Sequence, residues 1–141
     1  MIFWDVSALV RCYSREEPGS ARALHWLVHE TQHQGSALLV PEAVSGIVRR
    51  CRRDRRLADK ILGLLEDHLG DFTLVEIGAA QLERAVSLVR KHGLRAADAI
   101  HVATAVLHAR DLGRSAFRFA TCDVEQAAAA RAEGLRVVEP A

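Results

Sequence analysis

The segment IFWDVSAL, residues 2–9, guides the interpretation of the whole sequence. Its first three residues are large and apolar at consecutive positions, which is typical of a strand buried on both faces in the centre of a parallel sheet. Asp5 follows directly, and after it come a hydroxyl at Ser7 and the start of a helix. Open α/β sheets place their ligands outside the carboxyl ends of the strands. We therefore expect Asp5 to lie at the mouth of a cleft.

The composition is that of an ordinary globular protein. The chain has 141 residues, of which 50% are hydrophobic and 26% charged, with a formal net charge of +1. This length predicts a single domain over residues 1–141, and the near-neutral charge gives no overall argument for nucleic-acid binding. Three widely spaced cysteines outside any CxxC pattern predict reduced thiols in a cytoplasmic protein. No signal-peptide pattern and no membrane-spanning run of roughly 20 apolar residues is visible.

Short apolar runs alternate with helical periodicity along the chain, which predicts an α/β sandwich around a parallel sheet. After the opening strand, the expected strands are residues 37–40, 72–77, 117–121 and 136–138. The expected helices are residues 8–13, 20–35, a helix that begins at Pro41, a helix with the apolar stripe 57–65, and then residues 79–92, 97–112 and 123–134.

Four acidic residues each have a local structural explanation. Asp5 could cap the helix that follows it, and Glu42 lies in a first helical turn, where a negative charge favours the helix dipole. Asp98 also lies in a first turn, but among apolar neighbours, so a partly buried carboxylate there needs a partner or a metal. Asp123 stands three residues before Gln126, which is the spacing of a capping box.

Taken together, the four acids indicate one site. Asp5, Glu42 and Asp123 each follow the carboxyl end of an expected strand, and the helix of Asp98 can bring it to the same edge. Two unit charges about 4 Å apart repel by about 4 kcal/mol at an effective dielectric of about 20. Carboxylates in one cleft are therefore held apart, protonated or bridged by a cation. Oxygen ligands favour Mg²⁺ or Mn²⁺, and such a site indicates phosphate chemistry.

The sequence resembles the PIN-domain ribonucleases, and specifically the VapC-type toxins of type II toxin–antitoxin pairs. The resemblance spans essentially the whole chain. The segments that carry it are 5–9, Glu42 with 47–50, 97–103, and 120–123 followed by 127–134. It implies a three-layer α/β/α sandwich whose central sheet has five, mainly parallel strands.

The resemblance also implies a catalytic site for endoribonucleolytic cleavage of RNA by a metal-activated water. One or two Mg²⁺ ions, for which Mn²⁺ can substitute, would be held there, with Ser7 and Thr121 steadying the carboxylates. The implied metal ligands are Asp5, Glu42, Asp98 and Asp123. A homodimer and a small antitoxin partner are implied as well. The apolar residues that we expect to be available for such contacts are Leu24, Trp26, Leu27 and the segment 57–65.

Six arginines lie within residues 49–56. They are either a solvated helix face or a contact surface for an RNA backbone, since Arg and Lys make most phosphate contacts. Arg49 follows Glu42 by about two turns of the same expected helix, which favours the second interpretation. The RNA-binding candidates are Arg49, Arg50, Arg52 and Arg53. Elsewhere, His25, His29 and His33 predict a surface stripe on one helix, and His101 is expected to make a buried hydrogen bond.

Three alternative functions stay open. A haloacid-dehalogenase-like phosphatase or phospho-acceptor domain would use Asp5 as the nucleophile, but it needs a lysine at the sheet edge, and Lys60 and Lys91 lie in expected helices. A catalytically silent PIN domain that binds RNA or protein would have no need of all four acids. A PIN-domain nuclease of RNA processing, outside a toxin system, would share them.

Overall fold

A computed structural model describes residues 1–141 and contains one five-stranded sheet and seven helices. All strands are parallel, in the order β3-β2-β1-β4-β5. The strands are β1 (Ile2–Trp4), β2 (His33–Ser36), β3 (Phe72–Val75), β4 (Arg118–Ala120) and β5 (Arg136–Val138). The helices are α1 (Val6–Arg11), α2 (Ser20–His29), α3 (Leu39–Arg50), α4 (Arg55–Leu69), α5 (Ala79–His92), α6 (Ala96–Leu112) and α7 (Val124–Ala132). None of these helices combines the length and hydrophobicity needed to cross a membrane.

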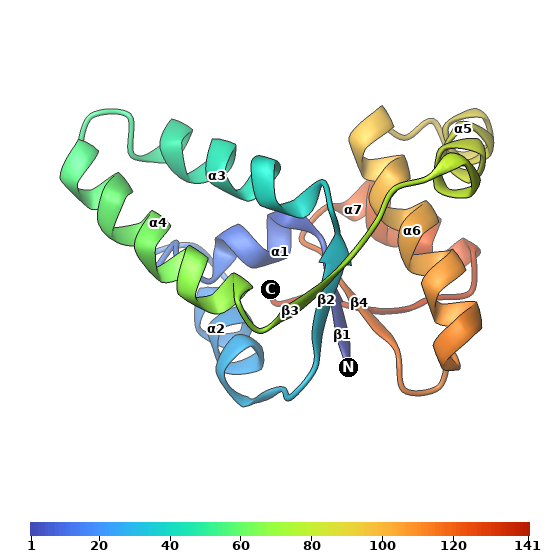
Figure 1. The fold of residues 1–141 in the computed structure, drawn as a ribbon, viewed down its shortest axis with the longest axis horizontal. Helices are drawn as coiled ribbons and strands as arrows, with labels where there is room; N and C mark the ends of the chain where they lie inside the picture. The colour runs from blue at the N-terminus through green and yellow to red at the C-terminus, as the bar shows by residue number, and fades with distance from the viewer.

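Helices cover both faces of the sheet, with α1 to α4 on one side and α5 to α7 on the other (Figure 1). The alternation of side chains along β1 produces the two cores. Ile2 and Trp4 pack in the core beneath α1 to α4, whereas Phe3 packs in the core of α5 to α7. A strand in this position needs apolar residues at every place, as its sequence indicated. The predicted three-layer sandwich with a five-stranded parallel sheet is confirmed.

The predicted position of the second strand is wrong. We expected residues 37–40, but β2 is His33–Ser36 and α3 begins at Leu39. The sequence HQGS has little intrinsic preference for a strand. Its four residues are nevertheless buried and paired with β1 and β3, and this tertiary context overrides the local preference. Gly35 therefore lies inside β2 and does not end a helix, and a Cβ at Gly35 would stand only 2.5 Å from a methyl group of Leu39.

The predicted histidine stripe is wrong for its third member. His25 and His29 lie together on α2, with their ring centroids 4.4 Å apart. His33 instead opens β2, where it is buried, and its Nδ1 accepts a hydrogen bond from Trp4 Nε1 at 3.0 Å.

The strand order reverses beside β1. The chain proceeds outward from β1 through β2 to β3, and then crosses back to add β4 and β5 on the other side of β1. Ligand sites of open α/β sheets form at such a switch point, outside the carboxyl ends of the strands. The ends of β1 and β4 are joined here, since the backbone N–H of Asp5 donates to the carbonyl of Ala120 at 2.9 Å. The fold therefore brings Asp5 next to the segment 121–123.

Candidate active site

Asp5 lies at the end of β1 and is the N-cap of α1. Its side chain is 1% exposed. The carboxylate Oδ2 accepts hydrogen bonds from the backbone N–H of Ser7, at 2.9 Å, and from the Ser7 hydroxyl. Oδ1 accepts a hydrogen bond from Gln126 Nε2 at 3.0 Å. The capping role is therefore real, and both carboxylate oxygens are fixed in position by the protein.

Ser7 and Thr121 connect the loops that follow β1 and β4. Their hydroxyl oxygens lie 3.2 Å apart. Ser7 Oγ also accepts a hydrogen bond from the backbone N–H of Cys122 at 2.9 Å, and Thr121 Oγ1 accepts one from the backbone N–H of Asp123 at 3.0 Å. The structure thus places both hydroxyl residues between Asp5 and Asp123.

Gln126 is a site residue that we did not predict. It is fully buried in α7, donates to Asp5 as described, and accepts a hydrogen bond from the Thr121 hydroxyl at 2.6 Å. Its backbone N–H donates to Asp123 Oδ1 at 2.8 Å, so half of the expected capping box is present. The side chain, however, turns inward to Asp5. The available signal was a long polar residue beside alanines on the inward face of this helix, because a buried amide needs partners.

Asp98 lies in the first turn of α6, and the environment there changes the pKa of its carboxyl group. Its pKa is raised to about 6, first by burial and then by the negative charges of Asp5 and Asp123, with a smaller contribution from Glu42. His101 acts in the opposite direction. The charges of Asp5, Asp123 and Glu42 all contribute to this shift, in agreement with the expectation that the four acids lie at one edge of the sheet.

Glu42 is oriented by a buried histidine. It lies in the first turn of α3, as expected, although α3 begins two residues before Pro41. His101 is fully buried, and its two ring nitrogens contact Glu42 Oε2 at 2.5 Å and Ser36 Oγ at 2.9 Å. Burial lowers the pKa of His101, but the hydrogen bond to Glu42 and the nearby negative charges outweigh burial and leave it raised. The expected buried hydrogen-bonding role of His101 is confirmed.

The chemistry of the four acids fits a hard divalent cation. All four donors are carboxylates, and oxygen is the ligand that Mg²⁺ and Mn²⁺ prefer. A cation among them would relieve the repulsion that raises the pKa of Asp98. No three His, Cys, Asp or Glu side chains stand together at ligand-binding geometry in the structure. The carboxylates are held instead by protein donors, Asp5 by Gln126 and Glu42 by His101.

The predicted RNA-binding arginines lie away from these carboxylates, at the opposite end of α3 from Glu42. Arg49, Arg52 and Arg53 are exposed and form no ion pair. Arg50 differs, because its guanidinium binds Glu17 Oε1 at 2.6 Å and also the Ser14 hydroxyl. The structure therefore does not bring the arginines next to the four carboxylates.

One family model matches the chain, that of the PIN domain, and it covers residues 2–132. The chain belongs to the PIN domain family. The match runs from β1 to the end of α7 and includes all four acids. No curated protein matches the chain by sequence.

Solved structures share the fold of this PIN domain over nearly its whole length. A toxin-antitoxin complex from Klebsiella pneumoniae is 22% identical, with a TM-score of 0.67 over 100% of this chain and 98% of that chain. FitAcB from Neisseria gonorrhoeae is 22% identical, with a TM-score of 0.70 over 99% and 98%. VapC20 of Mycobacterium tuberculosis, a Sarcin-Ricin loop cleaving toxin, is 19% identical, with a TM-score of 0.68 over 92% and 95%. At these identities the comparisons show a common fold.

We expect Asp98→Asn to stabilise this PIN domain in metal-free buffer. The raised pKa means that the folded state binds a proton more tightly than the unfolded chain, so the stability from Asp98 is complete below about pH 4 and is lost as the pH rises through about 6. Asp98 is only half-buried, so screened repulsion leaves an expected gain of about 1 kcal/mol, or about 2–4 °C in Tm, above about pH 7. Calorimetry in EDTA measures this difference, which should close near pH 4.

The matched control is Asp59→Asn, which removes an exposed carboxylate from α4. It should leave Tm unchanged at both pH values. A gain for Asp98→Asn that is the same at pH 4 and pH 8 would contradict the repulsion described above.

We also expect Gln126→Leu to destabilise the fold. The change removes the buried partners of Asp5 Oδ1 and of the Thr121 hydroxyl, which costs about 1–3 kcal/mol in the free energy of unfolding. Urea unfolding measures this loss. Gln32→Leu makes the same chemical change at an exposed position and should stay within about 0.5 kcal/mol of wild type. Equal stabilities of Gln126→Leu and wild type would show that this network does not hold Asp5.

Proposed function

We propose that this PIN domain is an endoribonuclease that depends on a divalent metal ion. The observation that carries the proposal is the group of four carboxylates at the switch point of the sheet, where burial and the charges of the other three acids raise the pKa of Asp98. Carboxylates gathered in this way are stabilised by a cation that compensates their negative charges. The ion we propose is Mg²⁺, with Mn²⁺ as a substitute, and its proposed ligands are Asp5, Glu42, Asp98 and Asp123.

A bound cation of this kind would supply an activated water and would stabilise negative charge on the phosphate. The protein would hold the carboxylates in place, through Gln126 for Asp5 and His101 for Glu42. No side chain of the site is suited to attack phosphorus itself. Burial raises the pKa of the Cys122 thiol, which keeps it protonated at neutral pH. His101 is fully buried with both ring nitrogens engaged, so it is a positioning residue.

Within this class we favour the toxin of a toxin–antitoxin pair, with RNA as substrate. Two similar structures are described as a toxin-antitoxin complex and as a toxin that cleaves the Sarcin-Ricin loop. We accordingly propose a small antitoxin that covers the carboxylate cleft, and a homodimer. A PIN-domain nuclease of RNA processing remains the second candidate, because the same carboxylates would serve it.

Exposed apolar side chains support the proposal of protein partners. Of the residues that we expected on the surface, Leu24 is 41% exposed and Trp26 is half-buried, but Leu27 is buried in the core and the expectation for it is wrong. Within the segment 57–65, Leu65 is likewise buried. The remaining large apolar side chains exposed on α2, α4 and α5 are Val28, Leu57, Leu64, Leu82, Val86 and Val89.

The phosphatase alternative is disfavoured by the positions of the two lysines. Lys91 Nζ binds Glu133 Oε1 at 2.8 Å, between α5 and the end of α7, and Lys60 is exposed on α4. A phosphate held on Asp5 would therefore have no lysine partner at the carboxyl edge of the sheet.

The test is cleavage of total cellular RNA by the purified protein, together with induced expression in bacteria. We expect discrete RNA fragments with Mg²⁺ or Mn²⁺ and none with EDTA, because the cation supplies the activated water. Asp5→Asn and Asp98→Asn should lose activity by at least about 100-fold, on the scale typical of a lost acid–base or electrostatic contribution. Expression of the wild type should arrest growth, and expression of either variant should not.

The matched control is Asp59→Asn, which should cleave RNA like the wild type. Folded protein that cleaves no RNA in a broad pool with either metal would contradict the nuclease proposal and favour a binding PIN domain. Metal-dependent cleavage without growth arrest, at equal protein levels, would reject the toxin and favour RNA processing.

A further inference from the structure

Five exposed arginines gather at the turn between α3 and α4. These residues, which we call the arginine tip, are Arg49, Arg52, Arg53, Arg55 and Arg56. None of the nine ion pairs of the structure includes any of them. Six arginines and one aspartate give residues 49–56 a net charge of +5, so the remainder of a chain that totals +1 carries −4. The positive charge of this protein is therefore concentrated at one end of a helical hairpin.

The arginine tip is unfavourable for the folded chain alone. Arg55 and Arg56 lie in the first turn of α4, where cations oppose the helix dipole. Arg52 and Arg53 lie in the turn directly before them, so four guanidinium groups fall within five residues of sequence. The one acid in the segment, Asp54, is occupied as the N-cap of α4, where it accepts from the backbone N–H of Leu57 at 3.0 Å. No ion pair in the structure offsets this concentration of charge, and the next acid along α4 is Asp59, one turn from Arg55 and Arg56.

We propose that the arginine tip is a second RNA-binding surface, which holds the phosphate backbone of the substrate at a distance from the cleft. The proposal rests on the nuclease function proposed above. Guanidinium groups bind phosphate in a bidentate manner, and such contacts dominate nucleic-acid affinity. Without a bound cation the four carboxylates repel a polyanion, so affinity for RNA in that state has to come from elsewhere. No aromatic residue lies between Ile47 and Ile61, so the arginine tip holds the backbone and does not stack bases.

The position of the arginine tip sets the length of RNA that it can hold. Helix α3 rises by about 1.5 Å per residue, so Glu42 and Arg49 are separated by about 10 Å along the axis, and the turn beyond Arg50 lies about 15 Å away. A stacked strand advances by roughly 3.4 Å per nucleotide, so four to five nucleotides span that distance. RNA of about two nucleotides can therefore lie at the carboxylates without touching the arginine tip, whose nearest member, Arg49, is about three nucleotides away.

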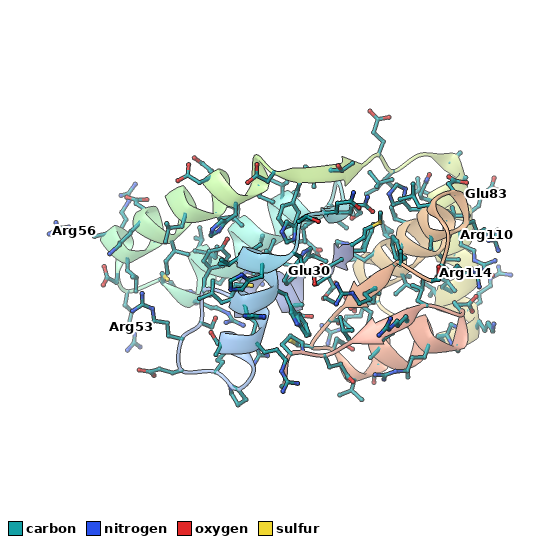
Figure 2. All side chains as sticks on the ribbon, turned by 90° about the horizontal axis from the view of Figure 1, so that it is seen from below. Glu30, Arg53, Arg56, Glu83, Arg110 and Arg114 are labelled. Atoms are coloured by element: carbon teal, nitrogen blue, oxygen red, sulfur yellow. The ribbon has the colours of Figure 1, made fainter.

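The test compares two double variants that each remove two exposed positive charges. Arg53→Gln/Arg56→Gln alters the arginine tip, and Arg110→Gln/Arg114→Gln is the matched control. Figure 2 shows these two pairs at opposite ends of the molecule. Binding of a labelled, unstructured RNA of about 20 nucleotides is measured by fluorescence anisotropy in EDTA, which prevents cleavage. The variant of the arginine tip should bind more weakly. The negative slope of the logarithm of the association constant against the logarithm of the salt concentration should become less steep by about 1.4, that is about 0.7 for each lost contact.

Kinetics provide a second readout with the active protein. For the long RNA, the variant of the arginine tip should have a raised KM and an unchanged kcat, because it loses binding without touching the reacting atoms. For an RNA of about two nucleotides, which is too short to reach from Glu42 to Arg49, variant, control and wild type should be alike. Melting temperatures check that the variants are folded. Because the change relieves repulsion between arginines, the melting temperature of the variant of the arginine tip should equal or exceed the melting temperature of the wild type.

The outcomes separate this proposal from the nuclease proposal. Suppose that the wild type cleaves no RNA and that only the variant of the arginine tip, not the control variant, loses RNA binding. That result would reject the nuclease and retain the binding surface. Normal RNA binding and KM in that variant, with cleavage intact, would overturn the binding surface alone. Equal losses in both double variants would overturn it as well, since a diffuse effect of charge would then suffice. Polyglutamate that displaces the RNA at equal concentration would assign the arginine tip to an acidic protein instead.

Discussion

The placement of four carboxylates at one edge of the sheet is the constraint on which the account of this molecule depends. The parallel sheet reverses its order beside β1, so the segments after β1 and β4 meet and bring Asp5 and Asp123 together. Helix α6 adds Asp98, whose pKa is raised to about 6 by burial and by the nearby negative charges. A fold can keep such a cluster only if other groups restrain it. Gln126 does so for Asp5, and His101 does so for Glu42.

The charges of the protein are separated along α3. Its first turn carries Glu42 and the negative cleft, and the turn that follows its last residue carries the arginine tip. A helix is a rigid spacer, so the fold fixes the distance between the carboxylates proposed to bind a cation and the arginines proposed to bind phosphate. This separation is compatible with the proposed binding of RNA by a chain whose net charge is only +1, because the proposed phosphate contacts lie away from the carboxylates.

The sequence predicted most of the fold because periodicity and turn signals agreed with the tertiary structure. The bounds of α5 and of β5 were predicted without error, and the four acids could be placed because each follows a strand or opens a helix. The prediction failed where tertiary contacts decide. HQGS becomes β2 only because β1 and β3 pair with it, and Gln126 reaches Asp5 across 121 residues of sequence. Arg50 belongs to a run of arginines in the sequence. In the structure the loop after α1 brings Glu17 near it, and the resulting ion pair distinguishes Arg50 from the unpaired arginines of the arginine tip.

The most direct test of the central claim is a titration of the purified protein with Mn²⁺, followed by the electron paramagnetic resonance signal of the free ion. We expect about one or two ions to bind per chain at about pH 8, and binding to weaken as the pH falls below about 6, where Asp98 becomes protonated. Asp98→Asn should bind Mn²⁺ far more weakly than the wild type, while Asp59→Asn should bind it equally well. A folded wild-type protein that binds no Mn²⁺, or an Asp98→Asn variant that binds it undiminished, would contradict the account.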